Sequence, residues 1–127
     1  SVLRPDHELN SRLKDLPGRK IVYTNAPRNY ALQALDRLQM NDMFDAVYAL
    51  EDADLIPKPN TSAYDTIFAK ASINPTQAAM FEDSPQNLLV PHSMGMKTVL
   101  VHGIRADAHI HHRTQNLSDF LTKLVTE

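Results

Sequence analysis

The 127-residue chain contains no cysteine and no tryptophan, and only three of its residues are glycine. Without cysteine there can be no disulfide, no thiolate nucleophile and no cysteine-ligated zinc site. The same absence suits a cytoplasmic protein, which is the location we expect. Three glycines are too few for a glycine-rich phosphate loop. No apolar run approaches the roughly 20 residues that cross a bilayer, so we expect no membrane segment.

An excess of charge of either sign is also missing. The formal net charge is -2, which gives no general attraction to nucleic acid or to an anionic membrane, and we expect neither as a partner. Hydrophobic residues make up 43% of the chain, an ordinary share for a globular protein. The length of 127 residues fits one domain with one hydrophobic core. The polar start "SVLRPDHELN" has no signal-peptide core. It also lacks an initiator methionine, so we interpret the chain as a trimmed piece of a longer protein.

Short apolar runs alternate with amphipathic runs along the chain. Runs rich in β-branched and aromatic residues predict strands, and apolar residues at helical spacing predict helices. Strands that alternate with helices favour an α/β fold, a Rossmann-like parallel sheet with helices on both faces. The predicted strands lie within 19–26, 44–50, 77–83 and 97–102, and the predicted helices within 6–16, 27–40, 61–73, 85–96 and 117–125. The helix that starts at Pro85 is expected to bend or end near Pro91.

Three of the four predicted strands end in polar residues. The pairs are Thr24-Asn25, Glu51-Asp52 and Glu82-Asp83, and Lys58 follows on the loop beyond the second strand. In open parallel sheets the ligand crevice lies outside the carboxyl ends of the strands. The polar residues are therefore expected to gather at one edge of one sheet.

Thr24, Asn25 and Lys58 each allow two interpretations. A hydroxyl, an amide and free backbone N–H groups at a strand end can bind an oxyanion, but Thr and Asn are also ordinary helix caps. Lys58 lies between Pro57 and Pro59, which stiffen its loop. A stiffened ammonium suits a phosphate, although a solvated lysine in a turn fits as well.

Glu82 and Asp83 are adjacent carboxylates at the end of an apolar run. Like charges so close together repel unless a cation or hydrogen-bond donors compensate. Carboxylate oxygens together with a substrate phosphate are the usual ligands of magnesium, and Asn87 could brace such a site one helical turn later. The alternative is an acidic first turn that stabilises the next helix without metal.

Two weaker patterns compete with this site. Residues 109–112 read "HIHH", and with His102 they suggest metal ligands by count, but no acidic partner accompanies them at the spacing of a zinc site. Solvated histidines are the better interpretation. In "EDAD", residues 51–54, Asp52 and Asp54 have the spacing of a nucleophile and an acid–base pair.

Taken in order, Thr24-Asn25, Lys58 and Glu82-Asp83 with Asn87 resemble the haloacid dehalogenase-like (HAD) superfamily of phosphatases. "IVYTNA" is similar to the second family motif, "IPKPN" to the third and "MFEDSPQNL" to the fourth. The branch of the family that the chain most resembles is the pyrimidine 5'-nucleotidase-like one. The segments that carry this resemblance are "GRKIVYTNAPRNYA", "LIPKPNTSAY" and "FEDSPQNL". The resemblance covers about residues 3–102, and three motifs in order are specific where each alone is weak.

The resemblance implies a role for each matching residue. Thr24 would hydrogen-bond the transferring phosphoryl group, with Asn25 beside it, and Lys58 would neutralise an aspartyl-phosphate intermediate. Asp83 would bind Mg²⁺ directly, and Glu82 would bind or orient the waters of the metal. These roles agree with the chemistry of phosphoryl transfer, which needs positioning and charge stabilisation.

One family element has no counterpart here. The first motif, an apolar strand ending in DxDxT/V that supplies the aspartate nucleophile, is absent before Gly18. "EDAD" is a poor replacement, because in this branch an acidic loop commonly occupies that place, away from Thr24 and Asp83. We therefore expect a C-terminal portion of a HAD core: residues 1–18 as a helix returning from the cap, and 19–127 as the later part of the core.

Several expectations follow for activity and partners. The isolated chain should hydrolyse little or nothing, because its nucleophile is missing. The parent would act on a small phosphomonoester, with pyrimidine nucleotides as the guess by analogy. The missing strand lies centrally in the family sheet, so its two neighbours would close up, another chain would supply the strand, or the first part was lost from a longer protein. An exposed sheet edge would also favour self-association. The alternative function is a non-catalytic domain that binds phosphate or a protein; a phospho-receiver domain fails on motif order.

Overall fold

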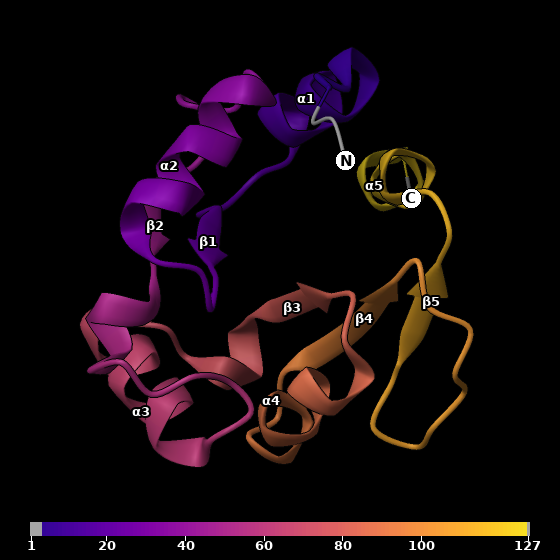
Figure 1. Ribbon diagram of the computed structural model, residues 1–127. Helices are drawn as coiled ribbons and strands as arrows, with labels where there is room; N and C mark the ends of the chain where they lie inside the picture. The colour runs from indigo at the N-terminus through magenta and orange to yellow at the C-terminus, as the bar shows by residue number, and fades with distance from the viewer. Residues whose placement is uncertain (1–3, 127) are drawn as a thin grey trace. The chain divides into compact units, whose positions relative to one another are not determined.

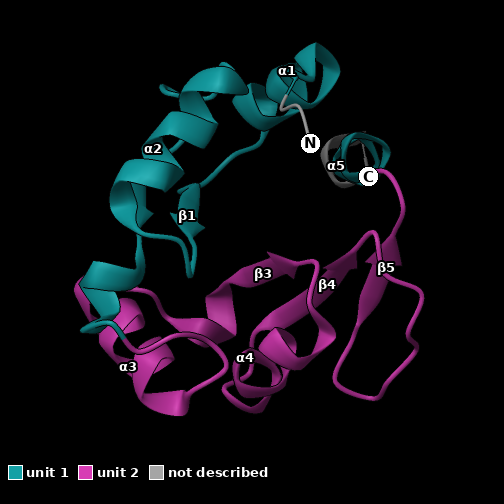
Figure 2. Cartoon of the chain, in the orientation of Figure 1, with its two compact units in different colours: residues 1–55, 117–127 teal, residues 56–116 magenta. Residues whose placement is uncertain are grey.

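The computed structural model describes residues 4–126 and divides the chain into two compact units. Unit 1 comprises residues 1–55 and 117–127, and unit 2 comprises residues 56–116 (Figure 2). Parallel strands occur in both units, which confirms the α/β class predicted from the sequence. The strands form two separate sheets, β1-β2 and β3-β4-β5, rather than one continuous sheet.

The described part of unit 1, residues 4–55 and 117–126, contains three α-helices and one pair of strands; the elements are labelled in Figure 1. The side chain of Asp6 caps the first helix by accepting from the Leu9 backbone N–H at 3.0 Å. Strands β1 and β2 pair in parallel with Ile21 opposite Ala46. The last helix packs on the first, and the elements are α1 His7–Asp15, β1 Ile21–Tyr23, α2 Arg28–Arg37, β2 Ala46–Tyr48, the 3₁₀ turn η1 Leu50–Ala53 and α5 Leu117–Thr126.

Unit 2 is built around strand β4, whose central residues are buried. β4 pairs in parallel with β3 on one side and with β5 on the other, and α4 packs on β4 while α3 packs on α4. The largest fully buried side chains of this unit include Tyr64, Ile67, Leu88 and Leu100. The elements are α3 Thr61–Lys70, the turn η2 Pro75–Gln77, β3 Ala79–Glu82, the turn η3 Pro85–Leu88, α4 Leu89–Ser93, β4 Lys97–Val101 and β5 His112–Thr114.

Three expectations about these elements need correction. The helix predicted from Pro85 ends near Pro91 as expected, since α4 stops at Ser93, but its first turn, Pro85–Leu88, is 3₁₀ rather than α-helical. Strand β5 was missed, because "HRT" has no apolar alternation and is set by pairing with β4. The strands that precede Thr24 and Asp83 have not closed up into one ladder, since β1 pairs with β2 and β3 pairs with β4.

Candidate active site

Glu82, the last residue of β3, is the centre of a hydrogen-bonded cluster in unit 2. Its Oε1 accepts from the Lys58 ammonium at 2.9 Å and from the Asn87 amide at 3.1 Å. Its Oε2 accepts from the backbone N–H groups of Asp83 and Ser84 at 2.9 and 3.3 Å. The Lys58 and Glu82 side chains are only 7% and 11% exposed, so this ion pair is largely withdrawn from water.

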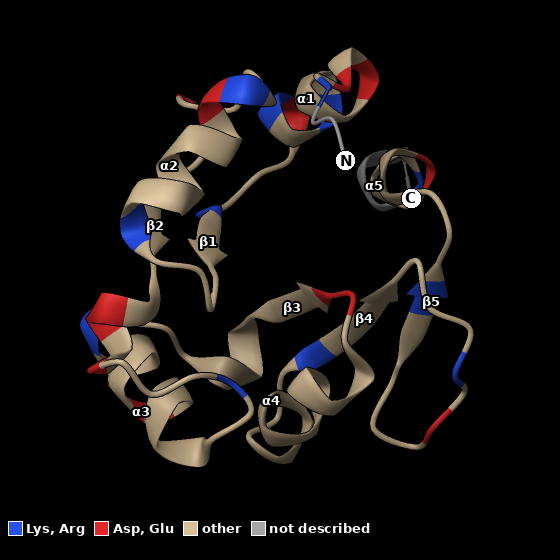
Figure 3. Cartoon of the chain, in the orientation of Figure 1, with Lys and Arg blue, Asp and Glu red and all other residues tan. Residues whose placement is uncertain are grey.

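Lys58 reaches this cluster from the loop that precedes α3, on the stiff Pro57-Lys58-Pro59 segment, whose Lys58–Pro59 peptide bond is cis. The Asn60 amide donates to the Pro57 carbonyl at 3.3 Å and helps to fold the loop back on itself. The sequence thus correctly grouped Lys58 with Glu82 at the carboxyl end of β3, where an acidic segment follows the strand (Figure 3).

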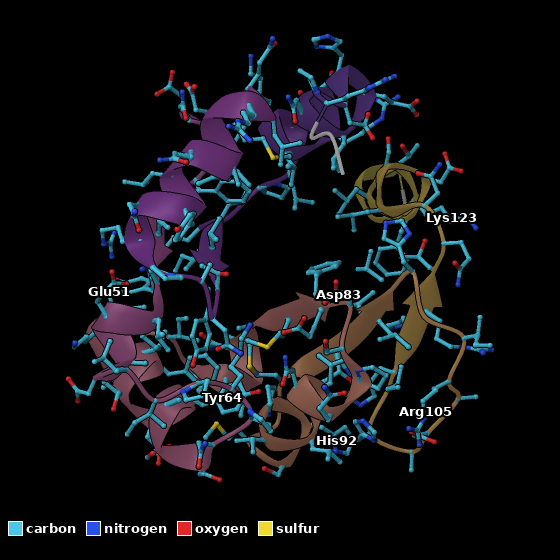
Figure 4. The ribbon with its side chains drawn as sticks, in the orientation of Figure 1. Glu51, Tyr64, Asp83, His92, Arg105 and Lys123 are labelled. Atoms are coloured by element: carbon cyan, nitrogen blue, oxygen red, sulfur yellow. The ribbon has the colours of Figure 1, made fainter. Side chains whose placement is uncertain are left out.

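Asn87 links the cluster to the core. Its side chain is almost buried and holds Glu82, while its backbone carbonyl accepts from the Tyr64 hydroxyl at 2.7 Å. Tyr64 on α3 is fully buried (Figure 4). Sequence reasoning proposed Asn87 as a brace but missed Tyr64. The helical stripe of residues 61–73 would indicate a core position for that residue, but not the bond made by its hydroxyl.

The two neighbouring carboxyls have opposite pKa shifts. Burial alone would raise the pKa of Glu82, but the Lys58 ammonium and the hydrogen bonds of the cluster outweigh burial, so that pKa is lowered. The pKa of Asp83 is raised by hydrogen bonding with Glu82, then by burial and by the charge of Glu82. These contacts favour the ionised form of Glu82 and disfavour the ionised form of Asp83.

This arrangement can be tested for its fit to a magnesium ion. Both Glu82 oxygens are engaged by donors, whereas Asp83 is exposed at the end of the strand. Together the two carboxylates bring two negative charges against the one positive charge of Lys58. Among residues 4–126 no group of three or more His, Cys, Asp or Glu side chains is placed to hold a metal. Asp83 therefore fits as one ligand of an ion whose remaining ligands would be water, substrate or another segment.

Thr24 and Asn25 belong to unit 1 and follow β1 directly. The Thr24 backbone N–H donates to the Tyr48 carbonyl at 3.0 Å and extends the β1-β2 ladder by one residue. The Thr24 hydroxyl accepts from the Ala26 backbone N–H at 3.1 Å. This is a turn in which a threonine side chain satisfies the backbone before α2. The N-cap residue of α2 is Pro27, so Thr24 is not a cap of that helix.

Glu51 and Asp52 of the "EDAD" segment make hydrogen bonds that hold the neighbouring backbone in place. The Asp52 carboxylate pairs with the Arg28 guanidinium and accepts from the Ala49 backbone N–H at 2.8 Å. Glu51 accepts from the Arg28 backbone N–H at 2.9 Å and so supplies the cap that Pro27 cannot give to α2. These contacts explain the acidic loop without a catalytic role, in agreement with the rejection of Asp52 as a nucleophile.

Comparison with known proteins bears on the same residues. Residues 8–101 match the family described as haloacid dehalogenase-like hydrolase. The chain belongs to this family. The matched range contains Thr24, Lys58, Glu82 and Asp83, so the order of motifs and the family agree.

Individual relatives extend the comparison. The validoxylamine A 7'-phosphate phosphatase of Streptomyces hygroscopicus subsp. limoneus is 32% identical over 75 residues, which are 59% of this chain and 35% of that protein. A HAD phosphatase from Thermococcus onnurineus has a similar fold, with a TM-score of 0.74 at 24% identity over 91% of this chain and 54% of that one. A HAD-type hydrolase from Bacillus subtilis, solved bound to magnesium, gives 0.77 at 14% identity over 93% and 54%.

The chain matches only part of the length of each of these proteins. The chain spans about a third of the curated relative and little more than half of these solved structures. At these identities the solved structures establish the fold, which is that of a partial HAD core.

No helix within residues 4–126 has the length and apolar character needed to traverse a lipid bilayer.

Proposed function

We propose that this chain carries the lysine-and-carboxylate half of the active site of a Mg²⁺-dependent phosphomonoester hydrolase. The observation that supports this most strongly is the Lys58–Glu82–Asn87 cluster beside the exposed Asp83. A buried ion pair that leaves one neighbouring carboxylate outside it provides a fixed positive charge and a metal ligand at the carboxyl end of β3. Family membership and the phosphatase relative point in the same direction.

Each residue then has a distinct task. The Lys58 ammonium, held by Glu82, would balance the negative charge of the phosphoryl group. Asp83 would ligate Mg²⁺, and Glu82 would position Lys58 and the Asp83 backbone rather than bind the metal itself. When bound, the metal would supply Lewis-acid polarisation of the phosphate oxygens. Phosphoryl binding by Thr24 and Asn25 is a role that the family resemblance predicts for the end of β1.

The nucleophile would come from sequence outside the 127 residues. Among the described residues no strand ending in DxD precedes β1, and both β1 and β3 are edge strands with a ladder on one side only. Edge strands accept a further strand readily, which supports pairing with such a segment in the parent or with another chain. We propose a small phosphomonoester as the substrate, with pyrimidine mononucleotides as the class to examine first.

The experiment is hydrolysis of p-nitrophenyl phosphate, CMP and UMP by the product of the complete reading frame that encodes these residues. Mg²⁺-dependent turnover that falls by a factor of about 100 or more in Lys58→Ala and in Asp83→Ala is expected, as for the loss of one electrostatic group in an active site. Asp52→Asn serves as the control and should retain activity.

The competing function is a non-catalytic domain that binds phosphate or a protein, which the absence of a DxD strand favours. A complete reading frame without an upstream apolar strand and DxD, together with no Mg²⁺-dependent turnover of any of the three substrates, would establish that alternative and overturn the hydrolase proposal.

A further inference from the structure

The imidazole of His111 takes the place of a backbone carbonyl where β5 joins β4. In a regular parallel ladder the C=O and the N–H of one residue bond to two residues of the neighbouring strand that lie two apart. The Thr98 carbonyl follows this rule and accepts from the His111 backbone N–H at 3.1 Å. The His109 carbonyl, which would accept from the Thr98 N–H, is occupied by the Thr98 hydroxyl at 2.7 Å. The Thr98 N–H donates instead to His111 Nδ1 at 3.0 Å.

The bond from Thr98 to His111 requires the neutral imidazole. A backbone N–H can only donate, so Nδ1 must offer its lone pair, and the hydrogen of the neutral ring resides on Nε2. A second proton would enter at Nδ1, and the cationic ring has no acceptor left. The Thr98 hydroxyl, 3.1 Å from Nδ1, could accept from the cation, but the Thr98 N–H would still lose its acceptor. Since Thr98 is fully buried, water cannot replace that acceptor.

His109, two residues earlier, is held by bonds that acid leaves intact. Its Nε2 lies 2.9 Å from the Pro85 carbonyl, which can only accept, so Nε2 is the donor. The neutral ring with its hydrogen on Nε2 and the cationic ring both carry that hydrogen. The bond from the Thr98 hydroxyl to the His109 carbonyl involves no titrating group. Within this segment, protonation therefore opposes the bond from the Thr98 N–H to His111.

The surroundings of the His111 ring oppose its protonation. The ring of His92 on α4 lies against it, with centroids 4.9 Å apart and planes at 38°. Within residues 4–126 no Asp or Glu lies within ion-pair distance of His111. Desolvation is the first cause that lowers the pKa of this ring, followed by the charges of Lys97, His92 and His112. The bond is thus complete above the ordinary pKa of 6.5 and is lost as pH falls through the lower folded value.

We propose that His111 and Thr98 form an acid-sensitive clasp, which holds residues 109–111 on β4 at neutral pH and releases them when the imidazole takes up a proton. His111 is exposed, so protons from solvent reach the ring directly, whereas the N–H that depends on it is buried. The clasp contains none of the residues of the candidate active site. It is therefore independent of the function proposed above.

Acid should loosen one end of the connection between β4 and β5 and leave the other end attached. The Gly103 carbonyl accepts from Gln115 Nε2 at 2.7 Å. The Ile104 carbonyl accepts from Arg113 Nη1 at 2.8 Å. Neither donor loses a proton between about pH 5 and pH 8. The part that follows β4 thus stays attached, and fraying begins where the chain enters β5.

The test is hydrogen exchange of the Thr98 amide in the ¹⁵N-labelled chain across this pH range, corrected for the intrinsic pH dependence of exchange. Protection of Thr98 should fall about fivefold toward acidic pH, the equilibrium weight of one ordinary hydrogen bond. The amides of α3 in the same unit should keep their protection. NMR of the His111 ring nitrogens should show the neutral form with its hydrogen on Nε2. Protection of Thr98 that is independent of pH, or a hydrogen on Nδ1 of the neutral ring, would overturn the proposal.

Three variants sharpen the test. His111→Asn supplies an amide oxygen in place of Nδ1 that accepts without titrating, so Thr98 should stay protected at acidic pH. His7→Asn, at an exposed position of α1, is the matched control and should keep the pH response of the wild type. His92→Phe retains an aromatic ring but removes a charge, so release should move to higher pH. The same pH response in His111→Asn and His7→Asn would contradict the assignment, and the backbone spectrum of each variant verifies its fold.

Discussion

Glu82 shows at the scale of one residue how an apolar strand can end in two carboxylates. It accepts four hydrogen bonds, which include one from the Lys58 ammonium and two from the backbone that follows β3. A carboxylate used in this way is a structural support, and it leaves Asp83 as the group available to a cation. The family resemblance assigned direct metal binding to Asp83 and metal or water binding to Glu82. The residue pattern did not predict that Glu82 is held by Lys58, because that contact depends on the loop that delivers the lysine.

The Lys58–Glu82 pair should show strong coupling in a double-mutant cycle. Lys58→Met and Glu82→Gln should each lower the free energy of unfolding by about 3 kcal/mol, because each removes the opposite charge that a nearly buried ionised group faces. The double variant should cost clearly less than the sum of the two. Chemical denaturation measures all four proteins, with exposed Lys70→Met as the control. Additive effects of the two substitutions would mean that the pair does not act as a unit.

Asp83 should lower stability in the absence of a bound cation. A carboxyl whose folded-state pKa is raised favours folding only when it is protonated, so the ionised group costs stability above that pKa. Asp83→Asn should therefore increase the free energy of unfolding at neutral pH, with the gain vanishing below the ordinary pKa of 3.8. Because Asp83 is exposed, the gain should stay below about 1 kcal/mol.

The pH dependence of Glu82 has the opposite sign. Its pKa is lowered on folding, so the stability it contributes is complete above its ordinary value of 4.5 and is lost as pH falls through the lower folded value. Denaturation of the wild type, Asp83→Asn and Glu82→Gln as a function of pH separates the two effects. A gain in Asp83→Asn that persists at acidic pH would contradict the electrostatic cause.

At the scale of elements, the strands and helices with a clear apolar periodicity were predicted correctly from the sequence. All four apolar strands formed within their predicted ranges, and helices formed in 6–16, 27–40, 61–73 and 117–125. The failures occur where tertiary contacts decide. Strand β5 is polar and depends on its ladder with β4, and the bond from Tyr64 to Asn87 joins elements that no local pattern connects.

Thr98 fastens the segment before β5 to β4. Its hydroxyl donates to the His109 carbonyl at 2.7 Å and accepts from the His111 backbone N–H at 3.1 Å. Thr98→Val keeps the shape but removes both bonds, so it should lower the free energy of unfolding by about 2 kcal/mol. Thr66→Val, which removes a solvent-exposed hydrogen bond to the Ser62 carbonyl on α3, is the control and should change it by less than about 0.5 kcal/mol. Equal effects would refute this role of Thr98.

At the scale of the whole molecule, the chain leaves unit 1 at residue 55 and returns to it at residue 117. The returning helix α5 packs on α1, and both contribute core residues, Leu121 and Leu13. Leu121→Ala should destabilise unit 1 by about 2–5 kcal/mol, the usual cost of a large-to-small core substitution. Hydrogen exchange should then show lost protection in α1 while β4 of unit 2 keeps more of its own. Protection lost first in β4 would contradict the division.

The family of the chain could be predicted from the sequence. Thr24, Lys58 and Glu82-Asp83 follow one another in motif order, and all lie within the matched range 8–101. The sequence did not supply the arrangement of strands in two sheets, because pairing partners are set by contacts distant along the chain. The roles of Thr24, Asn25 and Asp83 in phosphoryl transfer stay predictions.

The most direct test of the proposal that this chain holds half of a phosphatase site is turnover of CMP and UMP, with and without Mg²⁺. The 127-residue chain and the complete reading frame that encodes it are measured side by side. We predict Mg²⁺-dependent hydrolysis by the complete protein, abolished by Asp83→Ala, and none by the chain alone. Robust hydrolysis by the chain alone that Asp52→Asn abolishes would contradict the account.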